Sequence, residues 1–307
     1  MSIDKNYTLI TGASAGIGKA MAEECARRLQ NLILVALPGT GLETVGDFLG
    51  SKYKVDVKTL ELNLVKPHAI SYLYDWCQQQ NLRINILINN AGTGNYSSFV
   101  STSLEQYQKM IHLNSATVVS LTKMFVPKLM EHSKSYILNV GSFVSLMSVP
   151  YKSVYSATKS FVLAFSRALQ SELQQHGVYV SCICPGPTST ETVIKRNKSL
   201  GRKSDILMQT PGQVAKLAID GLLKKKGLII PGWKNKVILR LGPLLPFRLR
   251  SYILESIFKS GIQKQSEEET GSVNLRTSEE EKKCLPPFIG IRSYSNYMFK
   301  KNFSEVA

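Results

Sequence analysis

Seven short apolar runs, separated by longer segments of helical periodicity, restrict the fold of this chain more than any other feature of its sequence. Short apolar runs that alternate with helices are typical of a parallel sheet with helices on both faces. We therefore predict an α/β fold with a doubly wound parallel sheet of about seven strands. The predicted strands are 7–11, 31–37, 55–62, 84–89, 135–141, 178–184 and 227–230, and the best-supported helices are 16–29, 67–80, 104–132, 151–176 and 211–225.

These elements end near residue 232 and divide the 307-residue chain into three parts. Residues 1–232 have a suitable length for a single domain. Residues 233–262 form a basic and apolar C-terminal segment. Residues 263–307 begin with a polar, acidic stretch without apolar periodicity and are too few for a core of their own, so we predict a disordered tail.

The five cysteines are scattered, with no CxxC pair and no histidine at ligand spacing. This pattern predicts neither a disulfide framework nor a metal site, and it favours a reducing compartment. The N-terminal residues lack the basic and apolar regions of a signal peptide, and no apolar stretch approaches the length that spans a bilayer. We therefore expect a cytoplasmic protein and leave peripheral membrane association open. The cysteines are Cys25, Cys77, Cys182, Cys184 and Cys284.

A glycine-rich turn, Thr11-Gly-Ala-Ser-Ala-Gly-Ile-Gly18, lies between the first predicted strand and the first predicted helix. Glycines permit a tight turn and close approach of the backbone to a pyrophosphate, and the amides at a helix N-terminus stabilise its charge. Because the turn stands after a strand and before a helix, it predicts a dinucleotide site.

A second motif, Tyr155 followed by Lys159, lies near the start of the predicted helix 151–176. Residues four apart share one helix face, so both side chains point the same way. The same spacing recurs at Tyr297 and Lys301, but without a strand or a glycine turn nearby. Around Tyr155, polar groups and turns follow the carboxyl ends of strands, where ligands bind in open α/β sheets. They are Asn89–Gly92, Ser142, Pro185 and Gly186, with Asn114 in the helix between the fourth and fifth predicted strands.

Together these motifs resemble the classical short-chain dehydrogenase/reductase (SDR) family over residues 6 to about 232. The resemblance implies a Rossmann-type fold and NAD(P)-linked carbonyl reduction or alcohol oxidation. The family pattern TGxxxGxG, NNAG, Asn, Ser, YxxxK and PG is met by Gly12, Gly16 and Gly18, by Asn89–Gly92, by Asn114, by Ser142, by Tyr155 and Lys159, and by Pro185 and Gly186.

The resemblance assigns the catalytic roles to four residues. Tyr155 is expected to be the general acid/base, and Lys159 to lower its pKa and to hold the nicotinamide ribose. Ser142 is expected to hydrogen-bond the carbonyl oxygen, and Asn114 to hold a water that connects Lys159 to solvent. For the substrate we expect a small hydrophobic carbonyl or alcohol, contacted by Ser142, Val144, Met147 and Tyr155.

Residues 35–39 carry neither the acid usual in NAD users nor the base usual in NADP users. Because no acid stands there to repel a 2′-phosphate, the expected cofactor is NADP(H), with NAD(H) left open. Leu37 and Asn63 are expected beside the adenosine. The other predicted cofactor-binding residues are Gly12, Ser14, Gly16, Ile17, Gly18, Asn90, Ala91, Gly92, Tyr155, Lys159, Pro185, Gly186, Thr188 and Thr190.

The net charge of +16 is concentrated near the end of the predicted domain, since residues 221–254 contain eight bases and no acid. Three interpretations of residues 222–262 remain open: a substrate lid, an element on an anionic membrane surface, and a contact in a homo-oligomer. No nucleic-acid-binding module accompanies the bases, so no nucleic acid partner is expected. The alternative to an enzyme is a nucleotide-binding regulatory or membrane-adaptor protein that uses the SDR fold without turnover.

Overall fold

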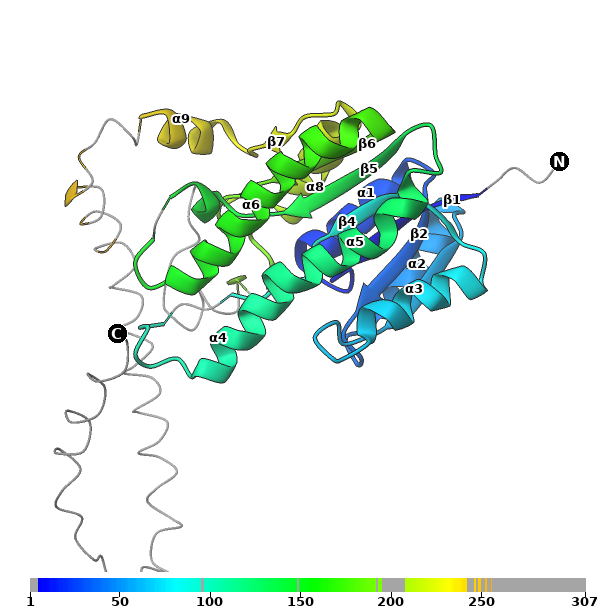
Figure 1. Ribbon diagram of the computed structural model, residues 1–307, viewed down its shortest axis with the longest axis horizontal. Helices are drawn as coiled ribbons and strands as arrows, with labels where there is room; N and C mark the ends of the chain where they lie inside the picture. The colour runs from blue at the N-terminus through cyan, green and yellow to red at the C-terminus, as the bar shows by residue number, and fades with distance from the viewer. Residues whose placement is uncertain are drawn as a thin grey trace, which may run out of the picture. The chain divides into compact units, whose positions relative to one another are not determined.

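The computed structural model describes residues 5–94, 97–147, 149–191, 193–194, 208–241, 246, 248–249, 252 and 255. Within these residues, seven parallel strands form one sheet in the order β3-β2-β1-β4-β5-β6-β7 (Figure 1). The predicted doubly wound α/β fold is confirmed. The strands are β1 (Asn6–Thr11), β2 (Asn31–Ala36), β3 (Val57–Glu61), β4 (Arg83–Asn89), β5 (Ser135–Val140), β6 (Val178–Ile183) and β7 (Leu228–Ile229).

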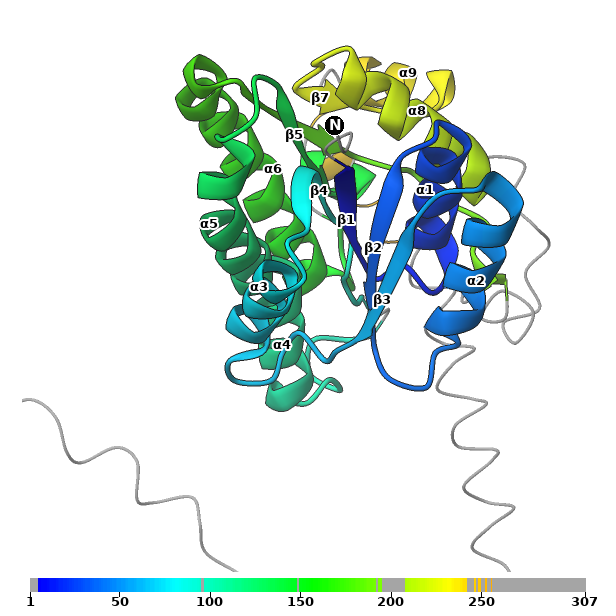
Figure 2. The same cartoon turned by 90° about the vertical axis from the view of Figure 1, so that its right-hand side faces the viewer.

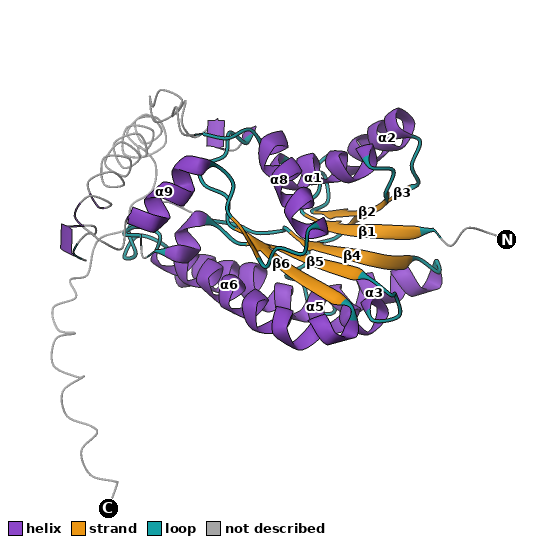
Figure 3. Ribbon diagram, turned by 90° about the horizontal axis from the view of Figure 1, so that it is seen from above, coloured by secondary structure: helices purple, strands orange, loops and turns teal. Residues whose placement is uncertain are grey.

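Helices cover both faces of the sheet, and each face has its own apolar core (Figures 2 and 3). Apolar residues of the central strands alternate between the two cores, which explains why these strands read as continuous apolar runs. One face carries α1 (Gly16–Arg27), α2 (Leu42–Tyr53) and α8 (Pro211–Leu223), and the other α3 (Ala69–Gln79), α5 (Thr117–Leu129) and α6 (Ser153–Leu173). Helix α4 (Leu104–Ile111) packs against α6.

Two helical details differ from the sequence expectation. Helix α2 lies outside the best-supported predicted helices, and its Gly46 and Gly50 have low helix propensity. Gly46 is needed there, since a Cβ on it would lie 2.6 Å from the Thr59 Cγ2 of β3. The predicted helix 104–132 is divided by a π-helical turn, His112–Ala116.

The predicted end of α6 is confirmed. A short 3₁₀ turn, Gln174–His176, follows this helix, and Gly177 adopts a φ of 76°. This left-handed conformation costs glycine little, so the chain can leave the helix and enter β6 directly.

Only part of the C-terminal segment belongs to the described residues. It forms helix α9 (Trp233–Leu241), which follows β7. The predicted tail 263–307 lies outside the described residues. None of the helices in the described parts is long and apolar enough to cross a membrane.

Candidate active site

The glycine-rich turn joins β1 to α1, as the sequence predicts. Gly12 and Gly16 have φ values of 67° and 57°, which favour glycine. A Cβ on Gly18 would overlap the Gly12 carbonyl oxygen and the Asn90 side chain. Ser14 and Ile17 lie in the same turn, and the first turn of α1 carries no acid. The turn therefore offers close backbone approach and a helix N-terminus to an anionic group.

Asn90 fixes this turn to the end of β4. Its Nδ2 donates to the carbonyl oxygens of Thr11 at 2.8 Å and Gly12 at 3.0 Å. In return, the Thr11 hydroxyl accepts the N–H groups of Asn90 at 3.0 Å and Ala91 at 3.1 Å. Thr11 is not among the predicted cofactor-binding residues, although it opens the TGxxxGxG pattern of the glycine-rich turn.

Asn114 lies at the centre of the π-helical turn and is fully buried. Its Oδ1 accepts the Thr93 N–H at 2.9 Å, and its Nδ2 donates to the Thr93 carbonyl at 2.8 Å and to the Thr158 hydroxyl at 3.1 Å. This one amide thus connects the loop after β4 to α6. Single π-helical turns inside α-helices occur frequently at functional sites.

Tyr155 is held near the N-terminus of α6 by its neighbours on two loops. A Cβ on Gly94 would lie 2.8 Å from its ring carbons Cδ2 and Cε2, so only glycine permits this packing. Ser142, at the end of β5, is a hydrogen-bond partner of its side chain. The Ser160 hydroxyl donates to the Ser145 carbonyl at 3.0 Å, which ties the Ser142 loop to α6. Sequence reasoning did not single out Gly94.

Lys159 is buried one turn after Tyr155, with its Nζ donating to the Val140 carbonyl at 2.8 Å. A Cβ on Gly92 would lie 3.3 Å from this Nζ and 3.1 Å from the Asn114 Oδ1. Gly92 therefore stands between the two side chains. The structure thus assembles all four predicted catalytic residues on the loops and helices at the carboxyl ends of β4 and β5.

The predicted substrate residues Val144 and Met147 belong to the loop that follows Ser142. Val144 is in the short 3₁₀ helix Phe143–Leu146, Met147 comes directly after it, and both side chains are half-buried. Their N–H groups are occupied within the loop, since that of Val144 donates to the Ser142 hydroxyl at 3.4 Å and that of Met147 to the Val144 carbonyl at 3.3 Å.

The turn that begins with Pro185 and Gly186, here called the PG turn, follows β6 and lies beside the glycine-rich turn. The Pro185 carbonyl accepts the Phe143 N–H at 2.8 Å, and Thr188 is buried. The Thr190 Cγ2 lies 3.2 Å from the Cβ position of Gly16. Gly186 packs against Asn235 of α9, whose Nδ2 would lie 2.5 Å from a Cβ on this glycine.

Leu37 and Asn63, the residues expected beside the adenosine, follow β2 and β3. Leu37 is exposed, whereas the Asn63 Oδ1 accepts the Val65 N–H at 3.2 Å. The Glu61 carboxylate lies beside the turn after β2, because both its oxygens accept the Gly39 N–H at 3.2 Å. This acid stands outside residues 35–39, at the end of the neighbouring strand β3, so its approach to the turn is not evident from the sequence.

A family model described as short chain dehydrogenase matches residues 6–201, a range that contains the glycine-rich turn and all four predicted catalytic residues. The chain belongs to the short-chain dehydrogenase family. It is therefore an NAD(P)-dependent oxidoreductase that acts on C=O or CH–OH groups, as the sequence predicts.

Relatives in this family include very-long-chain 3-oxoacyl-CoA reductases. The form B enzyme of Danio rerio is 31% identical over 76% of each chain, and the Homo sapiens enzyme 31% identical over 64% of each. A solved short-chain dehydrogenase from Sphingobium yanoikuyae in complex with NADPH is 30% identical, with a TM-score of 0.68 over 78% of this chain and 95% of that one. The bulky-bulky ketone specific alcohol dehydrogenase from Comamonas testosteroni is 28% identical, with a TM-score of 0.66 over 78% and 93%.

Burial governs the protonation of this dehydrogenase's two central groups. It raises the pKa of Tyr155, which the Ser142 hydrogen bond lowers in part and the nearby Cys184 raises further. The lowering of this pKa by Lys159 stays a prediction. Burial lowers the pKa of Lys159 itself to about 8, against the smaller raising effect of the Cys182 and Cys184 thiols. These two buried cysteines pack against Gly141.

Lys159 is expected to make the free energy of unfolding rise with pH between about 8 and 10.5, its folded and ordinary pKa values. The unfolded chain binds the additional proton in this interval, so stability increases as the pH rises. Below pH 8 the folded protein carries the full free-energy cost of the buried ammonium, and this cost decreases as the pH rises from about 8 to 10.5. In urea unfolding of the nucleotide-free protein, Lys159→Met should gain stability relative to wild type below pH 8, and the gain should shrink at higher pH. A difference independent of pH would contradict this assignment.

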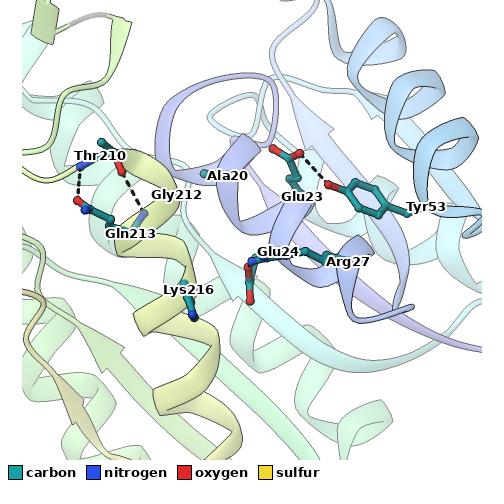
Figure 4. A pocket seen from close by; sticks show the side chains of 9 residues that line it. All are labelled: Ala20, Glu23, Glu24, Arg27, Tyr53, Thr210, Gly212, Gln213 and Lys216. Atoms are coloured by element: carbon teal, nitrogen blue, oxygen red, sulfur yellow. Dashed lines mark hydrogen bonds and ion pairs between the residues drawn. The ribbon is translucent and has the colours of Figure 1, made fainter.

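A pocket of about 420 Å³ lies elsewhere, between α1, α2 and α8 (Figure 4). Its polar groups largely pair with one another: Glu23 accepts the Tyr53 hydroxyl at 2.8 Å, Glu24 pairs with Arg27, and Thr210 and Gln213 form a helix cap. Since it opens on the face of the sheet opposite α6, we assign no catalytic step to it. Its lining residues are Ala20, Glu23, Glu24, Arg27, Tyr53, Thr210, Gly212, Gln213 and Lys216.

Proposed function

We propose that this dehydrogenase is an NADPH-dependent reductase of hydrophobic ketones, with Tyr155 as the proton donor. One observation carries the proposal: Ser142, Asn114 and the α6 pair Tyr155 and Lys159 come from three separate segments and meet at the carboxyl ends of the central strands. This is the edge at which open α/β sheets bind their ligands.

The residues around the glycine-rich turn fit a dinucleotide. The pyrophosphate would lie on the amides of Gly16–Gly18, which the close packing of Gly18 on the Gly12 carbonyl and the Asn90 side chain holds in place. Asn90, Ala91 and Gly92 would contact the ribose end, Lys159 the nicotinamide ribose, and Thr188 and Thr190 the nicotinamide from the PG turn. When bound, the nicotinamide supplies the hydride.

The chain's own residues would handle the substrate oxygen and the proton. The Ser142 and Tyr155 hydroxyls would both donate to the carbonyl oxygen, and Tyr155 would transfer its proton as negative charge develops there. The nearby Lys159 ammonium would stabilise the resulting phenolate. Asn114 would hold a water that connects Lys159 to solvent, the source of the replacement proton, since it lies across Gly92 from the Nζ.

Within this proposal, the substrate is a 3-oxoacyl thioester with a long acyl chain. The half-buried Val144 and Met147 supply apolar surface directly after Ser142. Relatives named very-long-chain 3-oxoacyl-CoA reductases support the same class, as does a neighbour specific for bulky ketones.

The test follows NADPH oxidation with 3-oxoacyl thioesters of increasing chain length and with small ketones as controls. We expect kcat/KM to rise with chain length, because each buried methylene contributes about 0.8 kcal/mol. Equal rates for short and long chains would contradict the acyl substrate. Measurable nucleotide binding without turnover of any carbonyl would instead favour the nucleotide-binding regulatory or adaptor protein.

NADH is the second candidate reductant, and Glu61 is the observation that favours it. Its carboxylate beside the Gly39 N–H could accept the ribose 2′-OH of NADH and would repel the 2′-phosphate of NADPH. Glu61→Gln is therefore expected to tighten NADPH binding several-fold relative to NADH, by fluorescence titration of each. Glu105→Gln, an exposed carboxylate on α4, is the matched control. Equal effects of both variants would remove Glu61 from cofactor selection.

A further inference from the structure

Helix α9 supplies none of the predicted site residues and lies largely at the surface. Only Asn235 of its nine residues is buried. Trp233, Val237 and Leu241 repeat every fourth residue and thus form one stripe along the helix. Their exposed fractions are 70%, 43% and 56%, so the stripe faces away from the protein. Large apolar side chains gathered in this way mark an interaction surface.

Cations border this stripe. Lys234, Lys236 and Arg240 belong to the same helix, and residues 221–254 include no acid to neutralise them. An apolar face with basic residues beside it is the pattern of a helix that lies in a membrane interface, where aromatic and aliphatic groups enter the headgroup region and bases meet anionic lipids.

The buried side of α9 is attached to the active site. The Asn235 Nδ2 donates to the Pro231 carbonyl at 2.7 Å, and its amide packs on the backbone of Gly186. Gly186 belongs to the PG turn, at the carboxyl end of β6. A surface that binds the outer side of α9 would therefore lie next to the edge of the sheet that holds the catalytic residues (Figure 1).

We propose that the outer face of α9 binds the surface of a bilayer containing anionic phospholipid. Charge complementarity selects this occupant over a second copy of the chain. In a two-fold contact between copies the same patch would face itself, so the cations Lys234, Lys236 and Arg240 of one copy would approach those of the other. Like charges in contact disfavour that arrangement, whereas lipid phosphates and carboxylates neutralise them. The proposal does not depend on the substrate.

The test is co-sedimentation of the full chain with phosphatidylcholine vesicles, with and without phosphatidylserine, at low and high salt. Binding is expected with phosphatidylserine and should weaken as salt rises. Reversing the charges at Lys234, Lys236 and Arg240 to Glu should lower the partition coefficient at least about tenfold, because each base near an anionic surface contributes about 1 kcal/mol. The same reversal at the exposed Lys66, Lys109 and Lys123 makes an equal change in net charge and is the control.

The apolar part is tested by Trp233→Ser with Val237→Ser and Leu241→Ser, which should also abolish binding. Phe48→Ser with Leu217→Ser removes exposed apolar groups from α2 and α8 and should leave binding intact. In a Trp76→Phe background Trp233 is the chain's only indole, so vesicles should shift its emission to shorter wavelength. The proposal would be overturned by no binding to either vesicle at low salt, or by equal losses of binding in the α9 and control variants. An emission shift that needs no vesicles and grows with protein concentration would also overturn it, and would show that a second copy of the chain covers α9.

Discussion

Replacing Tyr155 with Phe is expected to lower kcat for carbonyl reduction about 100- to 10,000-fold, the usual contribution of a positioned acid. The loss is specific to chemistry, because Phe keeps the ring that packs on Gly94 and removes only the hydroxyl. The Kd for NADPH should therefore stay within about threefold of wild type, a change below about 0.7 kcal/mol. Single-turnover NADPH oxidation and fluorescence titration measure the two quantities separately.

Tyr72→Phe is the control for this substitution, since Tyr72 is exposed on α3, a helix that carries none of the predicted site residues. It should leave both quantities unchanged. If Tyr155→Phe kept wild-type turnover, Tyr155 would not be the proton donor. If it instead lost NADPH binding together with turnover, the tyrosine would act on cofactor binding and not on proton transfer.

The sheet, and the meeting of the four predicted catalytic residues at one edge of it, were predictable because both depend on signals local to the chain. Buried parallel strands appear as short apolar runs, and polar residues placed directly after them must reach the same edge of the sheet. Tyr155 and Lys159 share a helix face by spacing alone. Gly177 likewise marks the end of its helix through its conformational freedom.

Features that depend on pairing between distant segments could not be predicted. Glu61 reaches the turn after β2 because the register of the sheet places it opposite Ala36, and this register is absent from the linear order. Gly46 reads as a helix breaker until Thr59 is placed beside it. Burial has the largest effect on the pKa of Lys159, and the degree of burial of one side chain cannot be read from the sequence.

The C-terminal segment could be predicted from the sequence only in part. Its bases and apolar residues are evident from the sequence, but which of them face outward is not. Asn235 determines which side of α9 faces the domain. Its side chain is buried, because Gly186 leaves room for its amide. The stripe of Trp233, Val237 and Leu241 then faces away from the domain.

Gly18→Ala is expected to raise the Kd for NADPH at least about tenfold and to lower the free energy of unfolding by about 1–3 kcal/mol, the usual cost of overpacking. The added methyl would overlap the Gly12 carbonyl oxygen and the Asn90 Nδ2, both parts of one hydrogen-bonded turn. The turn must open to admit it, and the amides that face the pyrophosphate move with the turn. NADPH fluorescence titration and urea unfolding measure the two effects.

Gly212→Ala is the matched control, because Gly212 also lies in the first turn of a helix, α8, and a Cβ there meets no atom within 4 Å. It should leave NADPH affinity unchanged, and stability equal or about 0.4–1 kcal/mol higher through the smaller entropy of the unfolded chain. Because the two substitutions add the same methyl group at similar helix positions, a difference between them isolates the contact with Gly12 and Asn90. Equal NADPH affinity in both variants would mean that the turn tolerates the methyl, and the glycine-rich turn would then lose its assigned role in holding the pyrophosphate.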